Sequence, residues 1–357
     1  MVVLLLLSSV VHSQESKKID SILAKANLMV YENPDAAIKS VSEVSQQFKL
    51  NTRQQTDALL TIASAYSTKR YNQKAIDYGL QAYRLAEAGN AEREQVRVLG
   101  FIGNQYYFLK MHDKVNLYLD MAEQIMNSKI DKDSLHFIKG NVYFVKGVNY
   151  KDKLDCDVAI SYFDKSIAEH SKATDNKSSS LNLSIAMIQK GLCLTDLLRL
   201  TEARLVLEKA HDIAQKNSHK ENEYYADIAL AKTFYAENNF KESNEILFRI
   251  RKEIDEFNAL SLQNDFYSAL ADNFLKLKDY ENYNIYSLKY LKVKNEIDSL
   301  EVNSFNNLIN EISLDSRSTL ETQKRDESVY YIIAFVVFLS LLGFIVFKTT
   351  RIRKSLQ

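Results

Sequence analysis

Small and large apolar residues follow one another along the chain in a pattern that repeats. In its clearest copy, Ala63 is followed three positions later by Tyr66, and a second segment brings in Ala75, Gly79 and Ala82. Residues three or four positions apart lie on one face of a helix, so the copy predicts two amphipathic helices. The small residue lets the second helix approach closely, and the aromatic ring fills the space beside it. Each copy therefore predicts one helical hairpin.

The same frame recurs five more times, at spacings of 40 or 44 residues. The small residues are Ala63, Gly103, Gly147, Gly191, Ala231 and Ala271, and the large ones three positions later are Tyr66, Tyr106, Tyr150, Leu194, Phe234 and Phe274. Of these we expect Ala63, Tyr66, Gly103, Tyr106, Gly147, Tyr150 and Gly191 to make the repeat-packing contacts, together with Ala203 and Ala210 on a second helix. An atypical first copy fits Leu28, Ala37, Val41 and Val44, with the Asn33-Pro34 turn between its helices.

The pattern resembles that of tetratricopeptide (TPR) repeats. One proline and eight glycines in 357 residues also favour long helices with short connections over a sheet protein. The predicted fold class is therefore all-α: an α-solenoid of TPR-like hairpins over residues 14–293, then a long helix and one transmembrane helix. The period exceeds the 34 residues of the usual TPR, which leaves other helical-hairpin repeats as a minor alternative.

The N-terminus opens with a short apolar run. Residues 2–7 are all Val or Leu, and the chain turns polar at Gln14. So short a run suits a signal peptide over residues 1–13, with Val11 and Ser13 at the cleavage positions. The alternative is a buried first helix.

Val329–Phe347 is a run of nineteen residues without a charge, long enough to cross a bilayer as a helix. The basic tail, residues 348–357, contains Lys348, Arg351, Arg353 and Lys354, which the positive-inside rule assigns to the cytoplasm. The sequence thus predicts membrane contact through Val329–Phe347. The predicted localisation is the bacterial inner membrane, single-pass, with the repeat domain exported and the C-terminus cytoplasmic.

Residues 294–328, between the repeats and this segment, are expected to form a juxtamembrane helix. Two interpretations stay open for it: a helix that completes the solenoid, slightly favoured because the heptad is irregular, or a coiled coil that forms a homodimer.

The composition gives no sign of catalysis. Basic and acidic residues number 46 each, and the sequence contains no glycine-rich phosphate loop, nucleophile elbow or metalloprotease motif. We therefore predict that the chain is not an enzyme and needs no cofactor or metal. Cys156 and Cys193 are interpreted as two buried thiols, with a disulfide between them as the alternative.

A binding surface remains as the functional feature. In a TPR solenoid the first helices of the hairpins line a concave groove, where a protein or peptide partner can bind. The residues predicted to line it are Asn104, Tyr107, Phe108, Tyr225, Lys232, Tyr235 and Asp272. The alternative is that each of them packs against the next repeat.

The order of parts resembles bacterial membrane-anchored TPR regulators that carry a cytoplasmic AraC-type helix-turn-helix domain. The resemblance rests on the repeats, on Asp298–Ile312 and on the apolar and basic C-terminal segments. It implies sensing outside the cell and transcriptional control inside. Only ten residues follow the apolar segment, where a helix-turn-helix needs about fifty, so no direct nucleic-acid binding is expected of this chain. The expected function is a membrane-anchored protein-interaction module, either the sensory or scaffold part of a signalling system or an envelope scaffold without a signalling role.

Overall fold

The computed structural model describes residues 2–128, 135–173, 178–257 and 259–303, with 305, 306, 309, 310 and 313. Regular structure in these residues is helical throughout, which confirms the predicted all-α class for them. The chain divides into two compact units, Met1–Ser304 and Phe305–Gln357, and the helical hairpins lie in the first.

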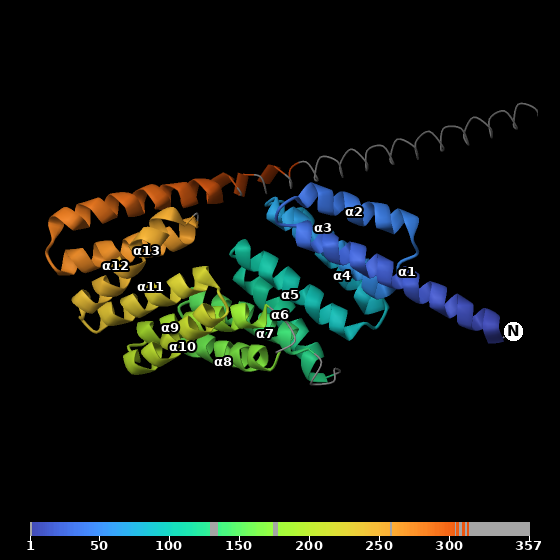
Figure 1. The fold of residues 1–357 in the computed structure, drawn as a ribbon, viewed down its shortest axis with the longest axis horizontal. Helices are drawn as coiled ribbons and strands as arrows, with labels where there is room; N and C mark the ends of the chain where they lie inside the picture. Colours follow the sequence, from blue (N-terminus) through green and yellow to red (C-terminus); the bar gives the residue numbers. More distant parts are fainter. Residues whose placement is uncertain are drawn as a thin grey trace, which may run out of the picture. The chain divides into compact units, whose positions relative to one another are not determined.

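Successive helices of this unit pair as hairpins (Figure 1). We name the first helix of each hairpin A and the second B. The A helices are α1 (Val2–Met29), α3 (Thr52–Thr68), α5 (Glu92–Phe108), α7 (His136–Asp152), α9 (Ser179–Asp196), α11 (Lys220–Ala236) and α13 (Leu260–Lys276). The B helices are α2 (Pro34–Gln47), α4 (Asn72–Ala88), α6 (His112–Ser128), α8 (Cys156–Lys172), α10 (Leu200–Lys216) and α12 (Phe240–Glu256), and residues 280–303 form a further B helix.

In three hairpins the small residue of the A helix is a glycine that packs directly against a side chain of the B helix. A Cβ atom built on Gly147 would lie 2.5 Å from the ring of Phe163, and one built on Gly191 would lie 2.4 Å from Leu207. Phe163 and Leu207 are fully buried, so neither can move aside cheaply. The three alanines of the predicted frame, Ala63, Ala231 and Ala271, are buried at the equivalent positions of α3, α11 and α13.

In four hairpins the aromatic residue three positions after the small residue pairs with a second ring, which lies on the B helix. Tyr106 stacks on Tyr118 with ring centroids 5.3 Å apart, and Tyr150 stacks on Tyr162 at 5.4 Å. Stacked pairs of this kind stabilise a contact beyond the area that they bury. The partner lies twelve residues after the first ring in each case, and the same spacing joins Tyr66 to Tyr78 and Phe274 to Tyr286. The sequence interpretation missed these partners.

Most connections between helices are short and contain one residue in the left-handed backbone region. At the α3–α4 turn Arg70 has φ of 61°, and the Tyr71 N–H donates to the carbonyl of Tyr66 across the turn. This is the hydrogen bond of a Schellman motif, in which glycine is the usual left-handed residue. Here none of the described glycines has a positive φ, and the residues that do are Arg70, Asn90, Lys110, Leu154, Leu198, Ser218, Asn238 and Lys278.

The first hairpin differs from its predicted frame. Asn33 caps α2 by accepting a hydrogen bond from the Ala36 N–H at 3.1 Å, in agreement with the predicted turn. Leu28, however, is 76% exposed, whereas Ile19, Leu23 and Ala26 of α1 are buried. Leu23 and Ala26 stand 40 residues before Ala63 and Tyr66, so α1 keeps the spacing of the repeat, but the large and the small residue have exchanged places.

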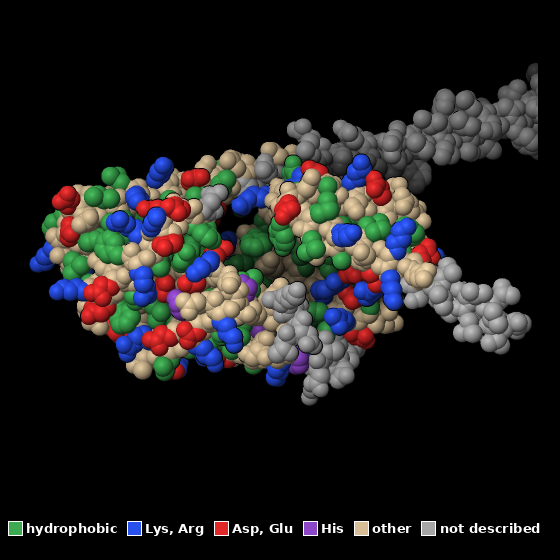
Figure 2. Space-filling model, viewed as in Figure 1, with side chains coloured by type: hydrophobic (Ala, Val, Ile, Leu, Met, Phe, Trp, Pro, Cys, Tyr) green, Lys and Arg blue, Asp and Glu red, His purple; other side chains and the backbone are tan. Residues whose placement is uncertain are grey.

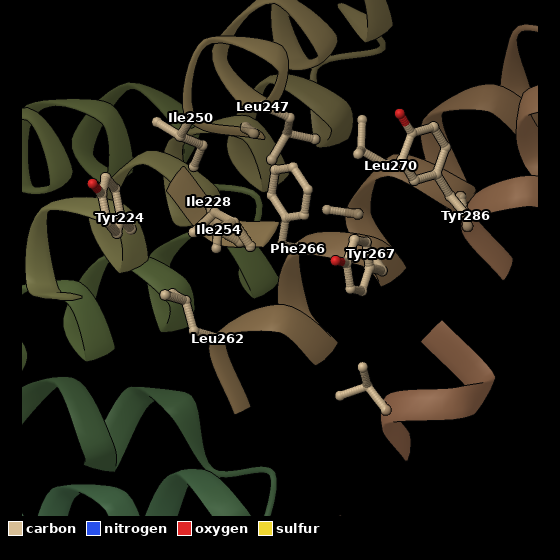
Figure 3. Close-up of a cluster of buried hydrophobic side chains, with 14 of the residues drawn as sticks. Tyr224, Ile228, Leu247, Ile250, Ile254, Leu262, Phe266, Tyr267, Leu270 and Tyr286 are labelled. Atoms are coloured by element: carbon tan, nitrogen blue, oxygen red, sulfur yellow. The ribbon is translucent and has the colours of Figure 1, made fainter. Parts of the chain in front are cut away.

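The last hairpin is completed by the helix over residues 280–303. Figure 3 shows the core cluster that it joins, in which Phe266 and Leu270 of α13 lie near Leu247 of α12. Tyr286 and Val293 of the last helix are buried in the same cluster, and Ile297 packs against it. Residues 294–303, in the first of the two units, continue the helix that begins at residue 280, so the predicted boundary between residues 293 and 294 falls inside this helix.

The predicted localisation requires correction. In the part of the chain that the structure describes, no helix is long and apolar enough to cross a bilayer. The longest, α1, becomes polar at Gln14 and runs without a break across the predicted signal-peptide boundary at Ser13. Residues 329–347 and the tail over 348–357, on which the inner-membrane prediction rested, lie outside the described residues. We withdraw the single-pass topology on this finding.

Replacing Gly191 by alanine is expected to destabilise the protein. The added methyl group would meet Leu207 at 2.4 Å, and overpacking of this kind costs about 1–3 kcal/mol, more than the helix propensity that alanine gains. Gly100 provides the matched control, because its nearest neighbour on substitution is a Val142 methyl group at 3.3 Å. Urea unfolding should show a loss of stability for Gly191→Ala and little loss or a gain for Gly100→Ala. Equal shifts in both variants would contradict the close-approach explanation.

Candidate functional site

The A helices α5, α7 and α9 line a cavity of about 380 Å³, which we call the groove. Its apolar lining includes Phe101, Phe137 and Phe144, and its polar lining includes Asn104 and Arg97. Val142, Val145, Ile138, Ile185, Gly100, Asn141 and Asn182 complete it. The volume falls in the range of ordinary ligand sites, which are mostly apolar with a few polar groups that fix orientation.

The repeat places equivalent positions of successive A helices side by side along the groove. Arg97, Asn141 and Ile185 each stand six residues before the small residue of their hairpin, and Tyr225 holds the same position on α11. Because the A helices pack in register, one position of the repeat generates one row of side chains.

Asparagine side chains supply neutral polar groups in the groove. The Asn182 amide donates from Nδ2 to Oδ1 of Asn141 at 2.8 Å, joining α9 to α7. Within the described residues no further side-chain hydrogen bond engages the amino group of Asn141, the side-chain carbonyl of Asn182 or the amide of Asn104. These groups offer both donors and acceptors toward a ligand.

Arg97 is held by carboxylates at one end of the groove. Its guanidinium pairs with Glu94 at 2.7 Å and hydrogen-bonds Asp57 on α3, which also lies 3.7 Å from Arg53. The positive charge of Arg97 is therefore compensated inside the protein. The groove presents amide and apolar groups more than net charge.

His170 of α8 supports the groove from behind. Its ring meets the edge of Phe137 at a centroid distance of 5.6 Å, and it is 2% exposed. Neither ring nitrogen has a hydrogen-bond partner in the described structure. Desolvation lowers the pKa of His170 from 6.5 to about 4, so the ring is neutral near pH 7.

Of the seven residues predicted to line the groove, Asn104 is the one that lines this cavity. Tyr107 is partly buried against the core clusters on both sides of it, and burial followed by the nearby Asp152 raises the pKa of its hydroxyl. Phe108 is 58% exposed and lies beside Tyr107. Tyr225 packs against the clusters of α9–α13, where burial raises its pKa.

The other three predicted residues lie toward the last hairpins. Lys232 forms an ion pair with Asp265 at 3.5 Å, and Tyr235 packs edge-on against Phe240 at 5.3 Å. Burial raises the pKa of Asp272, an effect opposed by Lys232 and Lys276. A binding role for these three remains a prediction.

Sequence reasoning missed the row that runs through Arg97, Asn141 and Ile185. Six of the seven predicted residues stand one to five positions after the small residue of their hairpin, whereas the groove is lined mainly by positions two to ten before it. Tyr225 has the repeat position of Arg97, Asn141 and Ile185, but it lies on α11, outside the groove. The signal was present: Arg97, Asn141 and Ile185 are spaced by the 44-residue period of their repeats.

Comparison with known proteins shows the fold. No family model matches the chain, and neither does a curated protein. The crystal structure of the apo form of RapI matches with a TM-score of 0.59 at 11% identity, over 79% of this chain and 99% of that one. Aspartyl phosphate phosphatase F from Bacillus subtilis matches at 0.55 and 14%, over 81% of this chain and 74% of that one. The Rap conjugation gene regulator of plasmid pLS20, solved with the Phr* peptide, matches at 0.54 and 15%, over 75% and 71%.

The chain is a solenoid of TPR-like helical hairpins. The resemblance to TPR repeats stated from the sequence is thereby confirmed at the level of the fold. Identities of 11–15% establish the fold alone.

Tyr107→Ala is expected to lower the free energy of unfolding by about 2–4 kcal/mol, because the ring fills space between two hairpins. Phe108→Ala, at the adjacent exposed position, should change it by less than about 0.5 kcal/mol. Thermal unfolding of both variants measures the difference. Equal melting temperatures for the two would show that Tyr107 is not part of the core.

The stability of the protein should depend on His170 between pH 6.5 and 4. The unfolded chain binds a proton at this residue that the folded chain does not, so stability falls as the pH drops through this range. The loss amounts to about 3 kcal/mol at most. Urea unfolding of the wild type and of His170→Leu at pH 7, 5.5 and 4.5 isolates the effect. A variant with the same pH dependence as the wild type would exclude His170 as the cause.

Proposed function

We propose that the repeats bind an extended peptide segment of a partner in the groove on α5, α7 and α9, as the recognition part of a regulatory system. The observation that carries this is the hydrogen-bonding capacity left on the Asn104 amide, the Asn141 amino group and the Asn182 side-chain carbonyl among apolar side chains. A carboxamide carries one donor group and one acceptor, as a peptide bond does, so it can pair with a peptide backbone of any sequence. The three phenylalanines then accommodate apolar side chains of the ligand.

The charge distribution supports a ligand held mainly by amide and apolar contacts. Figure 2 shows acidic and basic side chains interspersed over one face of the molecule. Formal net charge is zero, and Arg97 is already paired. The regulator of pLS20 provides a precedent for the fold, since its structure contains a peptide.

The test is selection of peptides from a random-sequence library by the purified chain. Peptides that the wild type enriches should be rich in apolar residues, and Asn141→Ala/Asn182→Ala should weaken their binding at least tenfold, because two backbone-pairing amides are lost. Fluorescence anisotropy with one enriched peptide measures the affinity.

Gln81→Ala/Gln124→Ala is the matched control, because both residues are exposed on B helices outside the groove. This variant should bind like the wild type. If the asparagine variant bound the enriched peptide as tightly as the wild type, or if the library yielded no enriched peptide, the groove would not be the peptide-binding site. A normal melting temperature for the asparagine variant is required before weaker binding is attributed to the lost amides.

A further inference from the structure

A second cavity, of about 420 Å³, lies on helices α10, α11 and α12. It shares no lining residue with the groove, which is formed by A helices alone. Two B helices and the A helix between them line it, so it belongs to a different part of the repeat surface.

The floor of this cavity contains two buried carboxylates from α11. The side chain of Glu223 is 11% exposed and accepts a hydrogen bond from Lys220 at 2.8 Å. The side chain of Asp227 is 4% exposed, and its Oδ1 accepts no hydrogen bond in the described structure. A buried carboxylate is costly unless it is paired and hydrogen-bonded, so Asp227 has unused capacity to bind a cationic donor.

The cations near Asp227 hold it only loosely. Arg249 lies 3.6 Å from Oδ1, beyond ordinary hydrogen-bond length, and its own side chain is 66% exposed. His211 Nδ1 lies 3.1 Å from the same oxygen, outside hydrogen-bond geometry, but its contact with Asp227 raises the pKa of His211 against the opposing effect of burial. Arg249 can turn into solvent at little cost because it is mostly exposed already.

The rim of the cavity adds negative charge. Glu208, Asp212 and Glu253 line its mouth, are exposed, and make no ion pair with another described residue. Carboxylates therefore outnumber the two permanent cations of the lining, Lys220 and Arg249, by five to two. No group of acidic, histidine or cysteine residues in the described structure has the arrangement of a metal site, which favours an organic cation.

We propose that this cavity binds a guanidinium or alkylammonium group, which displaces Arg249 and donates hydrogen bonds to Asp227 while the rim carboxylates attract it. An arginine side chain of a protein partner and a free polyamine share this chemistry. The site is independent of the peptide groove and of the function proposed for it.

Isothermal titration of the full chain at low salt with argininamide, and separately with spermidine, tests the proposal. At least one probe should bind at one site per chain. Saturation by argininamide alone indicates an arginine side chain as the natural ligand, and saturation by spermidine alone indicates a polyamine. Glu208→Gln/Asp212→Asn/Glu253→Gln should weaken binding by about tenfold, and Asp227→Asn should abolish it.

Glu242→Gln/Glu245→Gln/Glu256→Gln removes three exposed carboxylates of α12 outside the cavity and should leave the affinity unchanged. Asn141→Ala/Asn182→Ala should also bind the probes normally, which separates this site from the groove. Failure of both probes to saturate by about 10 mM would overturn the proposal. Equal weakening by the rim variant and the α12 control variant would also overturn it, because it would reveal non-specific attraction.

Discussion

Close contact between the two helices of each hairpin is the constraint on which the rest of this structure depends. Gly103, Gly147 and Gly191 leave no room for a Cβ atom, because Leu119, Phe163 and Leu207 occupy that space. The contact fixes the rotation of each A helix about its own axis. Once that rotation is fixed, the position six residues before the small residue faces a neighbouring A helix. Because successive repeats place this position side by side, it forms the row that lines the groove.

The groove and the cavity on α10–α12 use the same scaffold in different ways. Neutral amides and aromatic rings fill the row along α5, α7 and α9, where the nearest charge, on Arg97, is paired by Glu94 and Asp57. Charged residues dominate the second cavity, with two carboxylates buried on α11. A solenoid can combine such surfaces because each repeat contacts mainly its neighbours, so the residues outside the A–B contact can vary with little effect on the fold.

The sequence predicted the hairpins well because their spacing depends on local rules. Small residues at positions such as Ala63 and Gly147, and aromatic residues three positions later, are visible without a structure. The groove was predicted less well, and Asn104 was the one expected residue found on it. Which face of an A helix meets its neighbour depends on the rotation set by the A–B contact, and a pattern along one helix leaves that rotation open. The loose contacts of Asp227 arise between three helices and leave no pattern in the sequence at all.

The turns of the solenoid show where its stability could still be increased. Leu154 and Leu198 hold left-handed backbone conformations at φ of 62° and 57° while their side chains are 92% and 72% exposed. A residue with a Cβ atom costs about 1–2 kcal/mol in that conformation, and these side chains bury little surface in return. Glycine at these two turns would thus raise the melting temperature without altering the lining of either cavity.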